Sequence, residues 1–255
     1  MQEDWFEFRQ ALGLIATLIC ACWCARASAQ LKLDLAPEYY YWEEDYNGSK
    51  LLDESGFRIG LELSYKPERE QGWLWAGRIK IYGGSVDYNA VSQSSSGEPA
   101  AIKSTTDYYG ALLEGRYGYR WLLRPDYFLD GLAGVGVDAW LRRLQGPGGY
   151  DEFWLPLYFK AGFELGHRQT GWIGALGLKV PVYTSEFSKL DTSTLTLHPK
   201  TMVSAYAEAG YQFTTHFSAT AFFDSYWFKE SSVSQGFLQP ESKTFSAGAK
   251  LGWTF

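Results

Sequence analysis

A few side chains in this sequence have the types and the order that hydrolytic chemistry requires. His216 stands two residues before Ser218, and Glu230 follows twelve residues later. A histidine, a serine and an acid can activate a nucleophile if the fold brings them into hydrogen-bond contact. Asp191 and His198 lie seven residues apart and could together activate a water molecule. Whether either set can act depends on the elements that carry it.

Those elements are predicted to be strands, because apolar and polar residues alternate with a period of two from Leu31 onward. The clearest segment is 153–165, in which seven apolar residues occupy every second position. A strand of this length exceeds most strands of soluble sheets and fits a tilted membrane crossing. The alternation recurs in ten segments: 31–42, 57–65, 73–85, 108–120, 127–142, 153–166, 172–183, 201–213, 217–228 and 243–255.

The links between these segments alternate between short and long. Short periplasmic turns and long extracellular loops are typical of outer-membrane barrels. The pattern therefore predicts an all-β fold: a transmembrane antiparallel up-and-down β-barrel of about ten strands, with five extracellular loops. The short links are 66–72, 121–126, 167–171 and 214–216, and the long links are 43–56, 86–107, 143–152, 184–200 and 229–242.

The first 29 residues are predicted to be a cleaved secretory signal peptide. An uncharged apolar run, 11–24, precedes Ala27-Ser28-Ala29, which fits a signal cleavage site. The barrel domain would then comprise residues 30–255. All three cysteines lie within the leader, so we expect no disulfide and no cysteine metal site in the mature chain.

The composition supports a membrane barrel. The chain contains 18 Tyr, 16 Phe and 11 Trp, and barrels place such residues as girdles at both bilayer interfaces. Without the leader, 26 acidic and 21 basic side chains remain, a net charge of about −5. Nucleic acid as a partner would require a basic stripe, so we expect none. The expected surroundings are outer-membrane lipid and lipopolysaccharide.

A secreted soluble β-sandwich or lipocalin-like barrel is the alternative fold. A soluble barrel places apolar residues inside and charged residues outside. Here the charged residues share the strand face that carries the glycines, while the opposite face is almost purely apolar. This inversion favours lipid outside and a polar lumen.

The end of the sequence resembles the β-signal of Gram-negative outer-membrane β-barrel proteins. Phe255 is terminal, Trp253 and Leu251 occupy the alternate positions before it, and Gly248 lies upstream. In that family the barrel-assembly machinery recognises this segment, and periplasmic chaperones escort the chain. The resemblance therefore implies export through the periplasm and a location in the cell outer membrane.

Two enzyme families of the outer membrane invite comparison. Ten strands resemble the omptin proteases, which carry paired aspartates and an Asp-x-His motif; here Asp87 and Asp107 are far apart, and no Asp-x-His occurs. The segment from His216 to Glu230 resembles the lipid A deacylases. However, a periplasmic turn and the far end of the following strand are on the order of 30 Å apart. We therefore predict no catalytic residues.

The three histidines fall on different links, at spacings unlike those of metal ligands, so we expect neither a metal site nor a cofactor. Pro156 and Pro181 each remove a ladder donor and predict a bulge near the extracellular rim. Asn47-Gly48 is a hairpin turn signal.

The polar face of the strands carries nine cations and nine anions. A ten-stranded tube is narrow, and unpaired buried charges are costly, so we expect a paired network that fills the lumen. At mid-depth only the fifth strand is predicted to lack a charge; the others supply Glu38, Arg58, Arg78, Lys80, Glu114, Lys160, Lys179, Glu208, Asp224 and Lys250. The remaining inward charges are Lys32, Arg116, Arg142, Asp34, Glu62, Asp130, Asp138 and Glu164.

Three function classes follow from these patterns. The first is a non-enzymatic outer-membrane barrel with a charge-paired lumen, whose extracellular loops serve structural or surface-interaction roles. The second is a narrow channel for small solutes, and the third is a surface hydrolase. The first extracellular loop and the long, serine-rich second loop, 86–107, are the expected contact surfaces; the acidic residues of the first loop are Glu43, Glu44, Asp45, Asp53 and Glu54. The sequence specifies no oligomeric state.

Overall fold

The computed structural model describes residues 29–93, 99–146, 149–190 and 193–255. The predicted signal peptide therefore lies outside the described residues except for Ala29, and its cleavage stays a prediction. The strands are β1 (Ala29–Tyr46), β2 (Ser49–Pro67), β3 (Gly72–Gln93), β4 (Pro99–Leu122), β5 (Tyr127–Leu144), β6 (Asp151–His167), β7 (Gly171–Leu190), β8 (Ser193–Leu197), β9 (Lys200–Thr201), β10 (Ser204–Gln212), β11 (Phe217–Lys229) and β12 (Glu241–Thr254).

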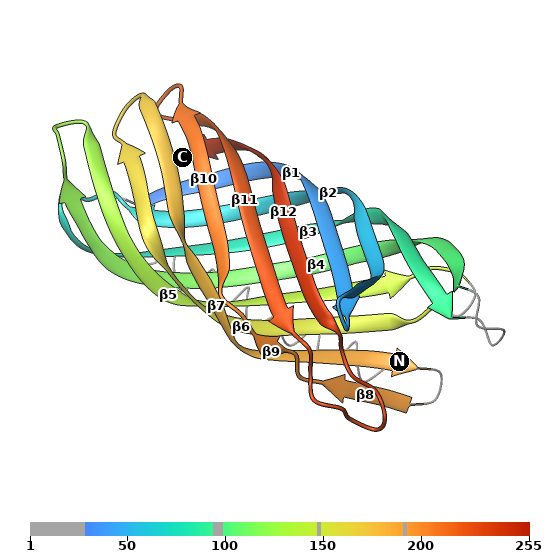
Figure 1. The fold of residues 1–255 in the computed structure, drawn as a ribbon. Coiled ribbons are helices and arrows are strands. Elements are labelled where there is room, and N and C mark those ends of the chain that lie inside the picture. The colour runs from blue at the N-terminus through green and yellow to red at the C-terminus, as the bar shows by residue number, and fades with distance from the viewer. Residues whose placement is uncertain (1–28, 94–98, 147–148, 191–192) are drawn as a thin grey trace, which may run out of the picture.

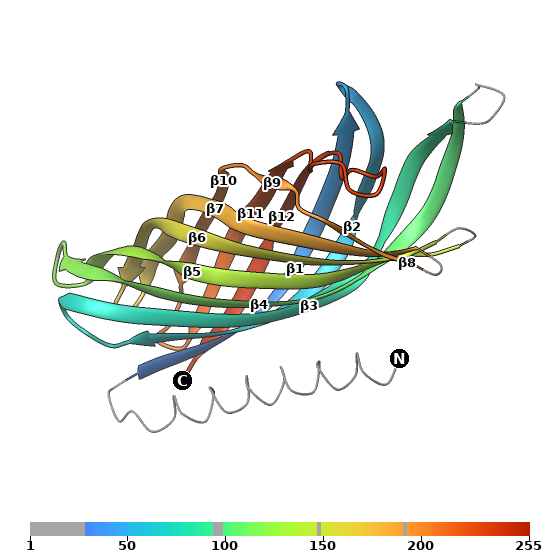
Figure 2. The same cartoon turned by 90° about the horizontal axis from the view of Figure 1, so that it is seen from below.

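Ten antiparallel strands close into a barrel, which confirms the predicted fold class. Neighbouring strands pair in chain order from β1 to β7, β10 pairs with β7, and β12 pairs with β1. Closure leaves no free sheet edge in the barrel wall. The remaining strands, β8 and β9, add to the wall at one end, where β8 pairs with the end of β7 and β9 with the end of β11 (Figures 1 and 2).

The ends of the barrel differ. Both described ends of the chain, Ala29 and Phe255, lie where the connections are short, and we call this the periplasmic end. At the other, extracellular end the strands rise well beyond the predicted segments. For example, β1 and β2 continue to a tight turn at Asn47-Gly48, where both residues have positive φ angles of 51° and 76°. These values are those of the hairpin turn that Asn-Gly predicts.

The prediction of long loops is therefore wrong for most of 43–56 and 86–107, which are strand. The eighth predicted strand, 201–213, also differs: β9 ends at Thr201 and β10 begins only at Ser204. A bulge is present at the predicted prolines, because the register between β6 and β7 shifts at Leu157/Tyr158, where Tyr158 pairs with Pro181. Its predicted place near the extracellular rim is wrong, because the two strands continue to pair beyond it as far as Asp151 and Lys189.

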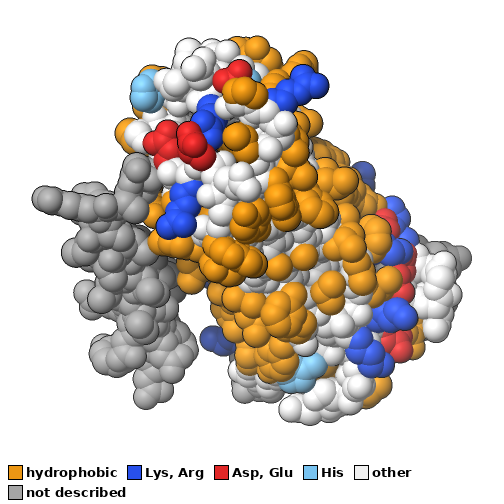
Figure 3. Space-filling view, turned by 90° about the vertical axis from the view of Figure 1, so that its left-hand side faces the viewer, with side chains coloured by type: hydrophobic (Ala, Val, Ile, Leu, Met, Phe, Trp, Pro, Cys, Tyr) orange, Lys and Arg blue, Asp and Glu red, His pale blue; other side chains and the backbone are white. Residues whose placement is uncertain are grey.

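The outer surface of the barrel is apolar over its middle. Large apolar side chains such as Phe57, Leu176 and Phe159 are more than half exposed there. Aromatic residues concentrate near the periplasmic end, where Trp73 stacks on Tyr117 at 5.3 Å. In Figure 3 hydrophobic side chains cover the flank, and charged side chains gather beyond its two ends. This distribution fits a lipid-facing belt. Among the described residues, no helix has the length and hydropathy to cross a bilayer.

Candidate functional site

Strand alternation places the charged side chains of the polar face inside the barrel. All ten residues predicted at mid-depth form an ion pair with another of the ten. We call this set the charge belt. Its pairs are Arg58–Glu38, Lys80–Glu38, Arg78–Glu114, Lys160–Glu114, Lys179–Asp224 and Lys250–Glu208.

Arg58 shows how tightly one member of the belt is held. Its guanidinium donates to Glu38 at 2.7 and 3.0 Å and to the Ser246 hydroxyl at 3.0 Å. The same group lies 3.7 Å above the ring of Tyr40, a cation–π contact. These contacts span three strands, β1, β2 and β12, so Arg58 crosslinks the wall from inside.

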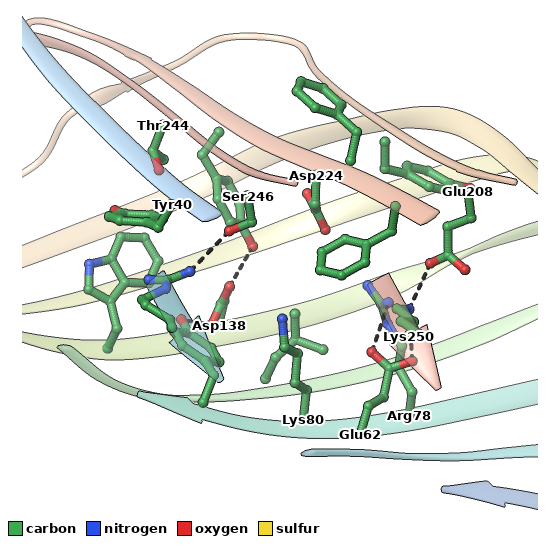
Figure 4. Close-up of a pocket in the computed structure, with 18 of the residues that line it drawn as sticks. Tyr40, Glu62, Arg78, Lys80, Asp138, Glu208, Asp224, Thr244, Ser246 and Lys250 are labelled. Atoms are coloured by element: carbon green, nitrogen blue, oxygen red, sulfur yellow. Dashed lines mark hydrogen bonds and ion pairs between the residues drawn. The ribbon is translucent and has the colours of Figure 1, made fainter. Parts of the chain in front are cut away.

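Other pairs join into a chain through Glu62. Its carboxylate lies 3.1 Å from Lys250 and 3.4 Å from Arg78, and Lys250 also contacts Glu208 at 2.8 Å (Figure 4). Arg78 in turn contacts Glu114 at 3.0 Å. Shared partners of this kind let one cation compensate two carboxylates.

The prediction that the fifth strand supplies no charge at this level is wrong. Asp138 of β5 is 5% exposed and lines the same small cavity, of about 60 Å³, as Lys80 and Asp224. Its carboxylate accepts hydrogen bonds from the hydroxyls of Tyr82, at 2.8 Å, and Tyr226, at 3.1 Å. Among the described residues no lysine or arginine forms an ion pair with it. The two tyrosine hydroxyls therefore stabilise the Asp138 carboxylate in place of a cation.

On the extracellular side of the belt the lumen is filled by aromatic rings. Trp42, Trp140 and Trp154 are at most 3% exposed. Trp140 and Trp154 stack at 5.7 Å, and Trp42 contacts both rings edge-on at 6.4 and 5.0 Å. Tyr226 and Phe228 extend the cluster from β11. Rings packed in this way exclude water from the section of lumen that they occupy.

Four carboxylates lie among these rings, and sequence reasoning missed them as lumen residues. Glu44, Glu54, Glu152 and Glu186 are at most 6% exposed. The expectation that Glu44 and Glu54 belong to an exposed contact surface is therefore wrong. The alternation along β1 and β2 indicates that these side chains point inward. Glu44 lies on the same strand face as the inward Glu38, and Glu54 lies on the same face as the inward Arg58.

Arg142 is the cation at the centre of this group. It donates to Glu54 at 2.7 and 3.0 Å and to Glu152 at 2.6 Å, and it lies 3.9 Å from Glu44. Trp42 donates to Glu44 at 3.0 Å, and Ser188 donates to Glu186 at 2.8 Å. We call the three tryptophans, the four glutamates and Arg142 the extracellular seal.

The periplasmic half of the lumen is more open. A cavity of about 210 Å³ lies there, with Lys32, Lys66 and Glu164 among its lining residues. Lys66 bridges Glu164, at 2.6 Å, and Asp130, at 2.7 Å. Asp130 also pairs with Arg120. Arg120 is absent from the predicted inward charges, although it lies on the same face of β4 as Glu114 and Arg116.

The hydrolytic candidates do not come together. His216 lies at the periplasmic turn before β11, where its ring stacks on Trp253. Glu230 follows the opposite end of that strand. Ser218 points into the barrel and is 4% exposed. Asp107 accepts from Ser85 and Gln145, and Asp87 lies on β3 opposite Thr105. The predicted partner of His198, Asp191, lies outside the described residues.

One serine–histidine contact was not foreseen. His198, which follows β8, folds back onto β7, where its Nδ1 lies 3.2 Å from the Thr184 carbonyl and 3.3 Å from Ser185 Oγ. A carbonyl only accepts, so Nδ1 carries the proton in this arrangement and cannot take one from the serine. The Ser185 hydroxyl donates to the Tyr183 hydroxyl at 2.9 Å, and Ser185 is 2% exposed. This geometry anchors the segment after β8.

The residues of the predicted assembly signal lie on β12 and directly after it. Leu251, Trp253 and Phe255 are exposed on the outer surface at the periplasmic end. Gly248 permits close packing of β12 on β1, because an added Cβ would lie 2.2 Å from the Pro37 carbonyl oxygen. No group of three His, Cys, Asp or Glu side chains among the described residues is arranged to hold a metal ion.

Comparison with solved structures supports the architecture. The outer membrane protease OmpT from Escherichia coli matches with a TM-score of 0.55 and 13% sequence identity, over 89% of this chain and 97% of that chain. The fold is that of an outer-membrane β-barrel. It supports a location in a Gram-negative outer membrane. At 13% identity the likeness extends to the fold and not to the activity.

Other matches are more distant. The translocator domain of the autotransporter NalP from Neisseria meningitidis has a TM-score of 0.44 and 8% identity, over 97% of this chain and 96% of that chain. The attachment invasion locus protein Ail of Yersinia pestis has a TM-score of 0.36 and 13% identity, over 89% of this chain and 99% of that chain.

Sequence comparison assigns no family. No family model matches the chain. A rhamnulokinase from Enterobacter sp. (strain 638) is 28% identical over 159 residues, which are 55% of this chain and 30% of the kinase. The chain thus spans less than a third of the length of the curated relative that it matches, and this match establishes no shared family.

Proposed function

We propose that this chain is an integral, non-enzymatic protein of the Gram-negative outer membrane, with a lumen closed by paired charges. Its five extracellular connections would serve structural or surface-interaction roles. The observation that carries the proposal is the filled lumen. The charge belt crosslinks the wall from inside, and above it Trp42, Trp140 and Trp154 are almost completely buried.

Single-channel recording on the refolded protein tests this proposal. A lumen filled by rings and ion pairs has no continuous water path, so we expect near-zero conductance at neutral pH. The narrow-channel alternative rests on the periplasmic cavity of about 210 Å³. A stable, well-resolved open channel in the wild type would establish that alternative and overturn the closed lumen.

The hydrolase alternative has one observation in its favour, the contact between Ser185 and His198 at 3.3 Å. A protease shares the fold, and hydrolysis of peptide or acyl-ester bonds is the activity to test. Because Ser185 is buried and Nδ1 of His198 faces a carbonyl, we expect no hydrolysis that depends on them. Activity lost in both S185A and H198Q, with the barrel still folded, would instead establish a catalytic pair.

Outer-membrane lipid is the expected surrounding of the apolar belt, and lipopolysaccharide the expected partner at its extracellular edge. Lys200 and Lys229 are directly opposed across β9 and β11 beside a groove of about 530 Å³, which is also lined by Lys243 and by Asp45, Glu230 and Glu241. Lys243 pairs with Asp45 and Glu241, whereas Lys200 and Lys229 form no ion pair among the described residues and suit anionic headgroups. We expect the triple change of these lysines to glutamine to weaken lipopolysaccharide retention during purification, without unfolding the barrel.

The barrel-assembly machinery and periplasmic chaperones are the proposed partners during biogenesis. Phe255 is exposed on the outer surface, so its deletion removes little packing. We expect the deletion to reduce insertion in cells much more than refolding in detergent. Equal losses in both assays would mean that Phe255 acts only as an interfacial aromatic residue.

A further inference from the structure

The extracellular seal holds more negative charge than its cation can compensate. Arg142 forms ion pairs with Glu44, Glu54 and Glu152, and Glu186 forms none among the described residues. Buried carboxylates that share too few cations cannot all remain ionised, because like charges and desolvation both disfavour the charged form.

Hydrogen bonds do not remove this surplus. Glu54 accepts from Tyr108 and Thr106, and Glu152 accepts from Trp154 at 3.2 Å. Glu186 is 1% exposed, and its Oε2 has no hydrogen-bond partner among the described residues. The seal also lacks a metal-binding arrangement of three acidic or histidine side chains in the described part of the chain. Protonation of Glu44 and Glu186 would remove this surplus of negative charge.

We propose that the extracellular seal is a proton-dependent closure of the lumen, held shut when Glu44 and Glu186 are protonated and loosened when Glu44 ionises. Ionisation of Glu44 would place a further anion among the stacked tryptophans, where it repels Glu152 and Glu54 and draws in water. The groups that act on these two carboxylates come from six barrel strands and two connections. They are Trp42 of β1, Glu54 of β2, Tyr88 of β3, Arg142 of β5, Glu152 of β6, Ser188 of β7, Tyr150 and Gln239. Tyr108 of β4 donates to Glu54.

Glu44 sets the pH at which this change occurs. It lies one residue beyond Glu43, whose carboxylate contacts the outward-facing Lys243 past the end of the apolar belt. Burial raises the pKa of Glu44 to about 7, with Arg142 lowering it and Glu152 raising it. A raised pKa means that the folded state binds the proton more tightly than the unfolded state. This contribution to stability is complete below about pH 4.5, falls as pH rises, and is lost above about pH 7.

The first test measures thermal stability against pH. From about pH 5.5 to about pH 8.5 we expect the Tm of the wild type to fall by about 5 °C. The double variant E44Q/E186Q carries neutral side chains of the same shape, so its Tm should change little over this range. The matched control is D151N, which removes a carboxylate at the same end of the barrel but on its exposed wall beside Arg143. It should follow the wild type.

The second test measures opening directly. Thr244 lines the lumen cavity together with Trp140, and it lies on β12 opposite Trp42 of the seal, so a thiol at T244C should become accessible from outside when the seal loosens. Cells would express this variant with Cys20, Cys22 and Cys24 changed to alanine and would be treated with a bulky, charged thiol reagent. Labelling would be normalised to S232C, which is exposed, to remove the pH dependence of the thiol itself.

We expect normalised labelling to rise at least tenfold between about pH 5.5 and about pH 8.5, and not to rise when E44Q/E186Q is added. If the double variant fails to insert, E44Q alone should abolish the rise near pH 7. Labelling that is constant with pH in the wild type, or that rises unchanged in the glutamine variants, overturns the proposal. In either case the conductance measurement still decides whether the lumen is closed at neutral pH, because the charge belt lies below the seal.

Discussion

At the extracellular end of the lumen one arginine, Arg142, faces four buried carboxylates. Below it every described lumen carboxylate except Asp138 forms at least one ion pair, and several cations are shared between two carboxylates. The seal is dry and packed with tryptophan, whereas the periplasmic half contains a cavity of about 210 Å³. Both regions hold charged side chains inside a narrow lumen, but the seal has one cation for four carboxylates, whereas the rest of the lumen pairs its charges.

This difference indicates where the barrel is rigid and where it can respond. A paired and partly wet network tolerates the loss of one member, because a neighbour or water can compensate. A dry group with a single cation does not, because no other charge is within reach. Single substitutions should therefore have effects that decrease from the seal through the belt to the periplasmic cavity.

The largest effect is expected for Arg142→Met. This change leaves Glu54 and Glu152 without their cation, and both are at most 4% exposed. Breaking a buried pair in this way typically destabilises a protein by about 3–5 kcal/mol. Urea unfolding in detergent micelles or bilayers measures the change.

The matched control is Arg143→Met. Arg143 is the next residue, but its pair with Asp151 lies on the exposed wall, with side chains 48% and 39% exposed. Exposed pairs contribute at most about 1 kcal/mol. Equal losses of unfolding free energy in the two variants would show that the seal is no more sensitive to the loss of a cation than the exposed wall is.

A smaller effect is expected in the belt for Lys179→Met. Lys179 is buried and pairs with Asp224, whose side chain is 26% exposed, so water can partly replace the lysine. We expect a loss of about 2 kcal/mol and a measurable increase in conductance, because the unpaired aspartate draws water in. The double variant K179M/D224N should be milder than K179M, as a double-mutant cycle would reveal. A double variant that loses the sum of both single losses would mean that the pair is not coupled.

The sequence predicted the ten-stranded barrel and the inward phase of the belt, because strands inside a bilayer must alternate strictly between lipid and lumen. This signal fades once a strand rises beyond the apolar belt. Glu43 and Glu44 are both charged, yet only Glu44 points inward, and the preceding aromatic residues, Tyr41 and Trp42, lie on opposite faces of the strand, so neither marks the phase. The sequence pattern therefore predicts an exposed loop where the structure has the seal. The contact of His198 with Ser185 depends on how the chain folds back after β8, which no local pattern records.

Glu208→Gln should have a still smaller effect. Lys250 would lose its contact with Glu208 at 2.8 Å but keep Glu62 at 3.1 Å. Glu208 is also 27% exposed in its side chain, so the loss should be about 1 kcal/mol. The temperature at which half of the protein shifts on a gel, measured for E208Q and K179M side by side, shows which variant loses more stability. A larger shift for E208Q would mean that Glu62 does not compensate Lys250.

The smallest effect is expected at the periplasmic cavity, for Lys66→Met. Lys66 bridges Asp130 and Glu164, but each of these carboxylates keeps an arginine, Arg120 for Asp130 and Arg116 for Glu164. The lysine side chain is 24% exposed to the cavity, so water can occupy the space that its ammonium leaves. We therefore expect a change in unfolding free energy below about 1 kcal/mol and no change in conductance. A loss as large as that of Arg142→Met would show that shared cations do not protect the periplasmic half.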